Sequence, residues 1–131
     1  MASHPRPLSP HLQVYRWGVQ MVTSILHRAT GIILSVGALL IAAALVAVAS
    51  GPEAWAIVGG WAGSPLGLLF LFGWVWAFLF HLLNGIRHLA QDMGLGCSIK
   101  AFVRNSWLSI IGSLVLALAI CGYVAITGGL L

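Results

Sequence analysis

Three long apolar stretches constrain this chain more than any other feature of its sequence. Each is close to the ~20 residues that an α-helix needs to cross the hydrocarbon core of a bilayer. The composition agrees, because 60% of the 131 residues are hydrophobic, only 6% are charged, and the mean hydropathy is +1.03. Such values exclude an ordinary water-soluble domain. The stretches cover roughly residues 29–50, 66–87 and 106–127.

The sequence therefore predicts an all-α membrane protein with three transmembrane helices. An N-terminal arm over residues 1–20 precedes a membrane domain over residues 21–131. The arm contains prolines and arginines and no early apolar core, so it does not resemble a cleavable signal peptide. We expect the spans at about 21–50, 65–92 and 105–127.

Turn and capping residues mark the ends of these spans. Serine followed by proline is a common start of a helix, and glycine commonly follows a helix end. The signals are Ser50-Gly51-Pro52 after the first span, Ser64-Pro65 before the second, Gly94 and Gly96 after it, and Asn105-Ser106 before the third. We expect a loop over residues 51–65, and a turn or two of interfacial helix over residues 97–105.

The few cations predict the orientation. They lie before or at the start of the first span and around the second connection, whereas residues 51–65 contain none. By the positive-inside rule, the N-terminus and the 93–105 connection face the cytoplasm or matrix, and the C-terminus faces outward. The net charge of +4 then reflects topology and anionic lipid headgroups rather than nucleic acid. The cations are Arg6, Arg16, Arg28, Arg87, Lys100 and Arg104.

The two cysteines limit the redox chemistry that the chain can carry. Cys97 falls in the inner connection and Cys121 toward the outer end of the third span, so a disulfide between them is excluded. Two thiols do not supply the four ligands of an iron–sulfur cluster, and no phosphate-binding glycine loop is present. Hydride and substrate chemistry must therefore belong to another chain.

A histidine deep in the second span is the main candidate for a functional residue. An imidazole in hydrocarbon costs free energy unless it is hydrogen-bonded or coordinates a ligand. At ~100° per residue, His81 shares one helix face, within about 40°, with four other residues. Two interpretations remain open: Gly85 leaves room for a flat group such as a porphyrin, or it admits a neighbouring helix with which His81 forms a hydrogen bond. The other residues of the stripe are Trp74, Gly85, His88 and Asp92.

Helix geometry restricts how His81 could bind an iron. Axial nitrogens lie ~4 Å apart across the metal, whereas seven helical residues separate His81 from His88 by ~10 Å. His27 is expected near the inner mouth, at a different depth from His81. If His81 binds a haem iron, the opposite axial ligand is therefore expected from another subunit, with the haem at a heteromeric interface.

A second constellation opens the first span. Its small residues from Gly31 onward predict a helix contact surface. Arg28 is either a snorkelling anchor or, together with Ser24, a binding site for a polar headgroup such as a quinone carbonyl or a haem propionate. His27 lies at the edge of this face, which comprises Gln20, Ser24, Arg28, Gly31, Ser35, Ala38 and Ala42.

Three motifs together resemble those of the cytochrome b subunit of succinate dehydrogenase, the larger of its two membrane anchors. The resemblance covers the arm and the first two spans in order, while the third span contributes only hydropathy and position. The motifs are Ser9-Pro-His-Leu-Gln-Val-Tyr-Arg16, Ser24-Ile-Leu-His-Arg-Ala-Thr-Gly31 and His81-Leu-Leu-Asn-Gly-Ile-Arg-His88, followed by Asp92.

The resemblance implies that the chain and a second three-helix anchor share one b-type haem, with His81 as the axial ligand from this side. It implies that Ser24 and Arg28 line a ubiquinone site completed by the iron–sulfur subunit and the second anchor. His27 and Arg28 would lie near the haem propionates, and His88 would have a supporting role. Electrons from succinate would arrive from a flavoprotein subunit through iron–sulfur clusters.

Three expectations accompany this interpretation. Asp92 pairs with His88 or Arg87, or caps the helix end in water. The short arm, which has no transit peptide, favours a bacterial plasma membrane over the mitochondrial inner membrane. The alternatives are a haem-free structural anchor of a related fumarate reductase or other complex, and a small proton or metal transport subunit.

Overall fold

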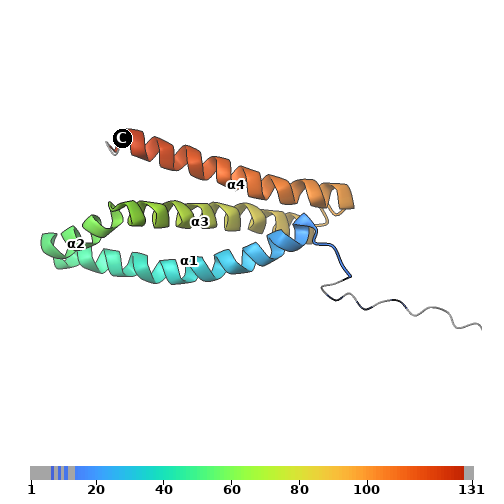
Figure 1. Ribbon diagram of the computed structural model, residues 1–131, viewed down its shortest axis with the longest axis horizontal. Helices are drawn as coiled ribbons and strands as arrows, with labels where there is room; N and C mark the ends of the chain where they lie inside the picture. The colour runs from blue at the N-terminus through green and yellow to red at the C-terminus, as the bar shows by residue number, and fades with distance from the viewer. Residues whose placement is uncertain (1–6, 8, 10, 12–13, 129–131) are drawn as a thin grey trace, which may run out of the picture.

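The computed structural model describes residues 7, 9, 11 and 14–128, and this part of the chain contains four helices and no strand. The first, third and fourth helices are long and apolar enough to cross a membrane, which confirms the predicted all-α class and the three spans. Much of the expected arm, residues 1–6, 8, 10, 12 and 13, lies outside the described residues. The helices are α1 (Val19–Ser50), α2 (Pro52–Ala62), α3 (Pro65–Asp92) and α4 (Ile99–Thr127) (Figure 1).

The three long helices run side by side, and α3 packs against both α1 and α4 (Figure 1). The short helix α2 connects α1 to α3 at one end of the bundle. The start of α1 and the connection between α3 and α4 lie together at the opposite end. The two segments predicted to face the cytoplasm or matrix therefore lie at the same end of the bundle, in agreement with the charge pattern.

The expected 51–65 loop is wrong in part, because most of it is the helix α2. Gly51 has φ +116°, a left-handed conformation that few residues other than glycine adopt, and it ends α1. Pro52 then occupies the first position of α2, where its missing N–H breaks no hydrogen bond. The predicted break after Ser50 is confirmed, but a new helix begins there instead of a loop.

Both predicted ends of α3 are confirmed. The hydroxyl of Ser64 accepts a hydrogen bond from the N–H of Gly67 at 3.1 Å, and Pro65 begins the helix. After Asp92 the backbone turns through Gly94 and Gly96, both with positive φ.

The expected start of the third long helix is wrong. The helix α4 begins at Ile99 rather than near residue 105, because Ser98 caps it by accepting a hydrogen bond from the N–H of Ala101 at 3.3 Å. The segment 97–105 is therefore not a separate interfacial helix. Apart from its first two residues, it forms the first turns of α4.

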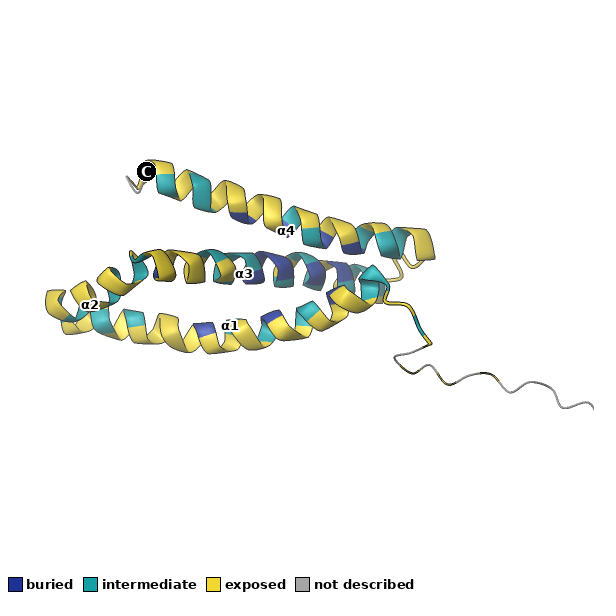
Figure 2. Cartoon of the chain, in the orientation of Figure 1, coloured by how far each residue is buried: buried dark blue, intermediate teal, exposed yellow. Residues whose placement is uncertain are grey.

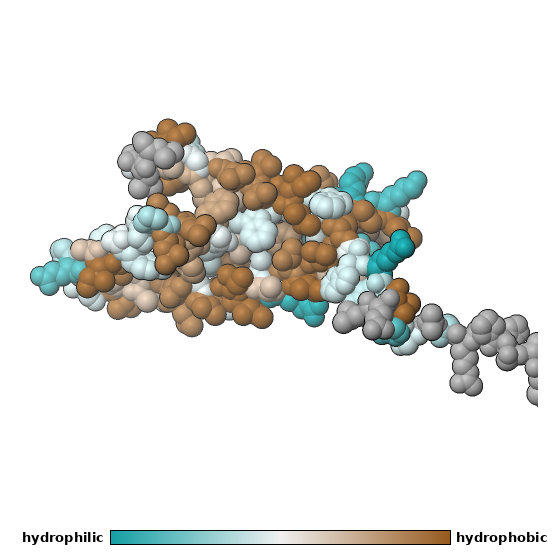
Figure 3. Space-filling model, viewed as in Figure 1, coloured by the Kyte–Doolittle hydropathy of each residue, from teal (hydrophilic) through white to brown (hydrophobic). Residues whose placement is uncertain are grey.

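Small and polar residues predominate at the buried positions of the described helices, with Leu79 and Phe80 of α3 as large apolar exceptions. On α4 the buried face consists of serines and one alanine, and the serine hydroxyls donate to carbonyl oxygens of their own helix. Figure 2 shows that buried positions concentrate on α3 and on the facing sides of its neighbours, while Figure 3 shows apolar side chains along the helices on the face in view. Such packing suits a bilayer, where close backbone contact replaces the hydrophobic effect. The buried residues of α4 are Ser106, Ser109, Ser113 and Ala117.

The predicted contact face of α1 is not the face that packs against α3 within this chain, so a contact with another chain through it stays a prediction. Ser35, Ala38 and Ala42 are exposed and do not form the contact with α3. The reason is a rotation set by Gly37, which receives the indole of Trp74, so that a Cβ atom at this position would overlap the ring. The residues of α1 that are buried lie on the adjacent face and are Thr23, Thr30 and Gly37.

Candidate functional site

Three histidines meet where α1 packs against α3. The rings of His27 and His81 stack with their centroids 3.9 Å apart and their planes 9° apart. The ring of His88 lies against His27 at 5.2 Å and 55°. The expectation that His27 and His81 lie at different depths is therefore wrong. Stacked rings face each other and do not point nitrogens at one metal from opposite sides, so this contact is not an axial pair.

The ring of His81 is fixed through Nδ1. This atom lies 3.1 Å from the carbonyl oxygen of His27 and 3.2 Å from the hydroxyl oxygen of Thr30. Because the carbonyl oxygen only accepts, Nδ1 carries the proton in this hydrogen bond, and the lone pair of Nε2 is left for a ligand.

Two glycines allow the histidines to approach the helices closely. A Cβ atom at Gly31 would lie 3.1 Å from Cε1 of His81, and one at Gly85 would lie 3.8 Å from Cε1 of His27. The stripe predicted on α3 thus faces α1 at Trp74, His81, Gly85 and His88, which confirms the helical periodicity. Asp92, the last residue of the stripe, is exposed at the helix end.

One polar atom in this cluster lacks a protein partner. Nδ1 of His27 is buried and has no hydrogen-bond partner within the described part of the chain. A buried nitrogen of this kind needs a donor or acceptor from water, another chain or a ligand. The cluster is therefore incomplete as it stands in the isolated chain.

Ser24 and Arg28 lie on the outside of α1, at the level where the histidine cluster begins. Both side chains are exposed, and Nε of Arg28 donates to the carbonyl oxygen of Ser24 at 3.5 Å. The structure thus brings the cation and the serine together, one helical turn apart. Ser24 and Arg28 are not enclosed together with the histidines. A headgroup bound to these two residues would therefore also contact the molecule that covers this face of α1.

Of the three alternatives for Asp92, a position in water at the helix end agrees with its exposure, whereas a pairing with Arg87 does not. Arg87 is buried and directs Nη1 to the hydroxyl of Ser106 on α4, with its guanidinium 5.0 Å from the ring centroid of Phe102. Arg87 thus makes its side-chain contacts with α4 and not with the carboxylate of Asp92. Residues 14–128 contain no ion pair at Asp92. Among the same residues, no hydrogen bond or ion pair joins Asp92 to His88.

Sequence reasoning missed two buried polar side chains near the cluster. Thr30 was not singled out, although it follows His27 by three residues and so lies on the same helix face. Asn84 is fully buried, and neither amide atom has a partner among the described residues. A polar residue flanked by apolar ones within a span was the available signal for both.

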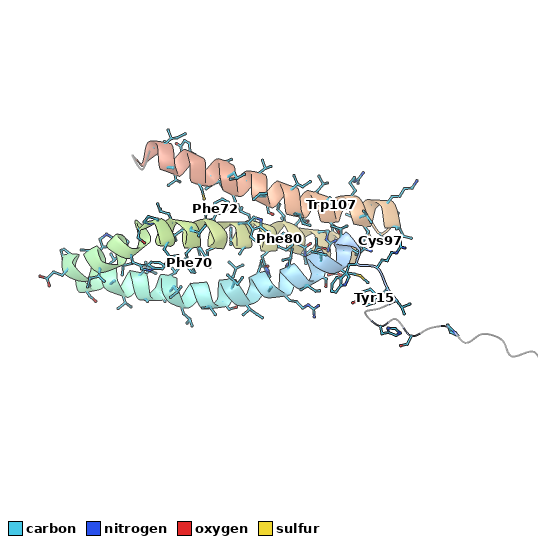
Figure 4. All side chains as sticks on the ribbon, viewed as in Figure 1. Tyr15, Phe70, Phe72, Phe80, Cys97 and Trp107 are labelled. Atoms are coloured by element: carbon cyan, nitrogen blue, oxygen red, sulfur yellow. The ribbon has the colours of Figure 1, made fainter. Side chains whose placement is uncertain are left out.

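A separate surface groove lies away from the histidines. An apolar groove of about 670 Å³ runs between α3 and α4, with Leu83, Arg104 and Trp107 among its lining residues. Figure 4 shows Trp107 on α4. None of the three histidines lines this groove, so the candidate site is the histidine cluster and the adjacent outer face of α1.

Comparison with known proteins identifies the family that this arrangement fits. Residues 2–120 match the family model described as succinate dehydrogenase/fumarate reductase transmembrane subunit. The succinate dehydrogenase cytochrome b556 subunit of Paracoccus denitrificans is 46% identical over 112 residues, which are 86% of this chain and 86% of that protein.

More distant relatives come from bacteria and from mitochondria. The cytochrome b556 subunit of Rickettsia felis is 34% identical over 120 residues, covering 86% of this chain and 88% of the relative. The mitochondrial cytochrome b560 subunit of Sus scrofa is 36% identical over 108 residues, covering 81% of this chain and 64% of the relative. The similarity thus spans the helices that carry the histidine cluster.

Proposed function

Because the chain belongs to the family of succinate dehydrogenase/fumarate reductase transmembrane subunits, we propose that it is the cytochrome b anchor of a succinate:quinone oxidoreductase. The chain is an integral, multi-pass membrane subunit of an oxidoreductase complex. In our proposal it holds one b-type haem together with a second anchor subunit. Succinate is oxidised on a flavoprotein, and an iron–sulfur subunit carries the electrons to ubiquinone at the inner membrane surface.

The single observation that carries the haem proposal is the hydrogen bonding of His81. Its Nδ1 faces two oxygen atoms, which leaves the lone pair of Nε2 available to an iron atom. Metal-binding histidines characteristically hold their second nitrogen in this way. The names of the relatives, cytochrome b556 and cytochrome b560, point to the same cofactor. A bound b-type haem would supply one-electron chemistry, and the chain would set its potential by ligand and burial.

The neighbouring residues fit the acidic edge of such a cofactor. His27 offers a buried nitrogen without a partner, and Arg28 follows it on the exposed side of α1. We assign both to the haem propionates, since a guanidinium and an imidazole N–H bind carboxylates by charge-assisted hydrogen bonds. His88, which touches the ring of His27, supports that ring. The stacked imidazole of His27 would then have to leave the face of His81 when the site is filled.

We assign Ser24 and Arg28 to the quinone site. Their exposure on α1 leaves them free to meet a headgroup held against the iron–sulfur subunit and the second anchor. Arg28 would stabilise the charge that develops on the quinone oxygen during reduction, and the Ser24 hydroxyl would donate a hydrogen bond to a carbonyl oxygen. The protein would act in a bacterial plasma membrane, since the Paracoccus denitrificans relative is bacterial, and the positive-inside rule favours an N-terminus on the inner side.

The test is the reduced-minus-oxidised absorption spectrum of the complex, purified through a tag on this chain after coexpression of its partners. We expect a b-type haem signal that His81→Leu abolishes or shifts. An unchanged spectrum in an assembled His81→Leu complex would exclude His81 as the ligand. A well-assembled complex that never contains haem would establish the haem-free anchor instead.

A further inference from the structure

Thr30 is a buried threonine whose hydroxyl faces the candidate haem ligand from the neighbouring helix. Its side chain is 2% exposed, and Oγ1 lies 3.2 Å from Nδ1 of His81. The same oxygen lies 2.8 Å from the carbonyl oxygen of Leu26 and 3.0 Å from that of His27. Carbonyl oxygens only accept, so the hydroxyl hydrogen goes to one of them. The lone pairs of Oγ1 are then the only groups that Thr30 can offer to His81.

The second neighbour of Nδ1 imposes the same requirement. The carbonyl oxygen of His27 lies 3.1 Å from Nδ1 and also acts only as an acceptor. Two acceptors on one ring nitrogen require the tautomer in which Nδ1 bears the hydrogen. In that tautomer Nε2 bears no hydrogen in the neutral ring and has its lone pair available.

We propose that Thr30 is a positioning residue that fixes the tautomer and ring orientation of His81, so that Nε2 is the atom presented to the haem iron. This inference rests on the proposed function, because it takes His81 as the ligand. The backbone at Gly31 completes the seat of the ring, since a Cβ atom there would lie 3.1 Å from Cε1 of His81. Consecutive residues of α1 thus define two edges of the imidazole.

A purely structural role for Thr30 makes a different prediction. Threonine hydroxyls in membrane helices commonly bond the carbonyl oxygen one turn earlier and need no other partner. Thr23 is such a residue, since it is fully buried on the same helix and, among the described residues, its hydroxyl donates only to the carbonyl oxygen of Gln20, at 3.1 Å. Thr23→Val therefore removes an equivalent hydroxyl without touching His81, and serves as the matched control.

The experiment compares Thr30→Val, Thr30→Ser and Thr23→Val in the intact complex. An acceptor on Nδ1–H makes the imidazole more basic and stabilises ferric iron, so its loss raises the midpoint potential of the haem. We expect a higher potential and changed ferric EPR g-values in Thr30→Val, with haem affinity about 10- to 100-fold lower, the range for lost outer partners of a metal ligand. Thr30→Ser and Thr23→Val should keep the values of the unmodified complex.

The outcomes separate this inference from the proposed function. A Thr30→Val complex whose potential and g-values equal those of the unmodified complex would overturn the positioning role, even if His81→Leu abolishes the haem signal. An equal change in Thr30→Ser would overturn it too, because the hydroxyl is then not the cause. If Thr30→Val does not assemble, Thr30→Ala removes the hydroxyl with less volume and is judged by the same two measurements. Unaltered haem in His81→Leu would instead refute the ligand assignment itself.

Discussion

Arg87 of α3 donates a hydrogen bond from Nη1 to the hydroxyl of Ser106 on α4, at 2.5 Å. Both residues are buried, with Arg87 6% exposed and Ser106 fully buried. The Ser106 hydroxyl donates a hydrogen bond to the carbonyl oxygen of Phe102 at 2.9 Å, so this hydroxyl acts as both acceptor and donor. This contact joins the helix that carries His81 and His88 to α4.

We expect Ser106→Ala to destabilise the complex by about 1–3 kcal/mol, because it leaves a buried guanidinium N–H without an acceptor. Thermal unfolding of the solubilised complex measures the change. Ser50→Ala is the control, since that exposed hydroxyl bonds only the carbonyl oxygen of Val46 in its own helix. Equal melting temperatures for the two variants would show that the contact contributes nothing.

A second prediction concerns the packing of α1 on α3 at Gly37. The indole of Trp74 occupies the place where a Cβ atom would stand, so Gly37→Ala must displace a large ring. We expect a loss of about 1–3 kcal/mol, the usual range for an added group in a filled contact. Because the same contact sets the rotation of α1, the haem spectrum should also change.

Gly73→Ala on α3 is the matched control for this variant. A Cβ atom at Gly73 meets nothing within 4 Å, and alanine favours helix by up to about 1 kcal/mol over glycine. We therefore expect unchanged or slightly raised thermal stability. If Gly37→Ala behaves like Gly73→Ala, the close contact with Trp74 is not a determinant of the packing.

The helical periodicity of α3 and its turn signals were predictable from the sequence, because they depend on residues close together in the chain. The face that carries His81, Gly85 and His88 follows from 3.6 residues per turn alone. The ends at Ser64 and Gly94 follow from local conformational preferences. These features stand in the structure as the sequence predicts them.

The position of His27 opposite His81 could not be predicted in the same way. It depends on how far α1 slides and rotates against α3, and that is set by the contact of Gly37 with Trp74, residues far apart in sequence. The acceptors of Nδ1 of His81 are likewise on the other helix. The face that carries Ser35, Ala38 and Ala42 is exposed in the single chain and stays a predicted contact surface.

A third prediction tests the quinone assignment through Arg28. We expect Arg28→Leu to reduce succinate–quinone activity by about 100- to 1,000-fold, the range for removing a donor that stabilises developing negative charge. Succinate oxidation with a soluble dye as acceptor should remain, since that site lies in another subunit. The two activities are measured on the same membranes.

Arg104→Leu controls for the loss of a positive charge on the inner side. Arg104 is exposed on α4 and lines the groove between α3 and α4 rather than the histidine cluster. We expect normal quinone reduction in this variant. Normal quinone turnover in Arg28→Leu would remove Arg28 from the site, and an equal loss in Arg104→Leu would indicate a general effect of charge.

The last prediction concerns orientation. Cys97 is exposed beside the connection between α3 and α4, at the same end as Tyr15 (Figure 4). Cys121 lies 22 residues beyond Ile99 in α4, which at 1.5 Å per residue is ~33 Å along the helix, so the two thiols stand toward opposite membrane surfaces. With the N-terminus inside, an impermeant maleimide should label Cys97 in inside-out vesicles of a Cys121→Ser variant, and not in right-side-out vesicles.

A complementary variant tests the outer side of the same topology. Thr127→Cys, in a background without Cys97 and Cys121, places a thiol at the exposed end of α4. We expect it to react only in right-side-out vesicles, because the C-terminus faces outward when three helices cross the membrane from an inner N-terminus. Labelling with the opposite sidedness in both variants would invert the topology, and would place Ser24 and Arg28 at the outer surface, where the iron–sulfur subunit of this proposal could not reach them.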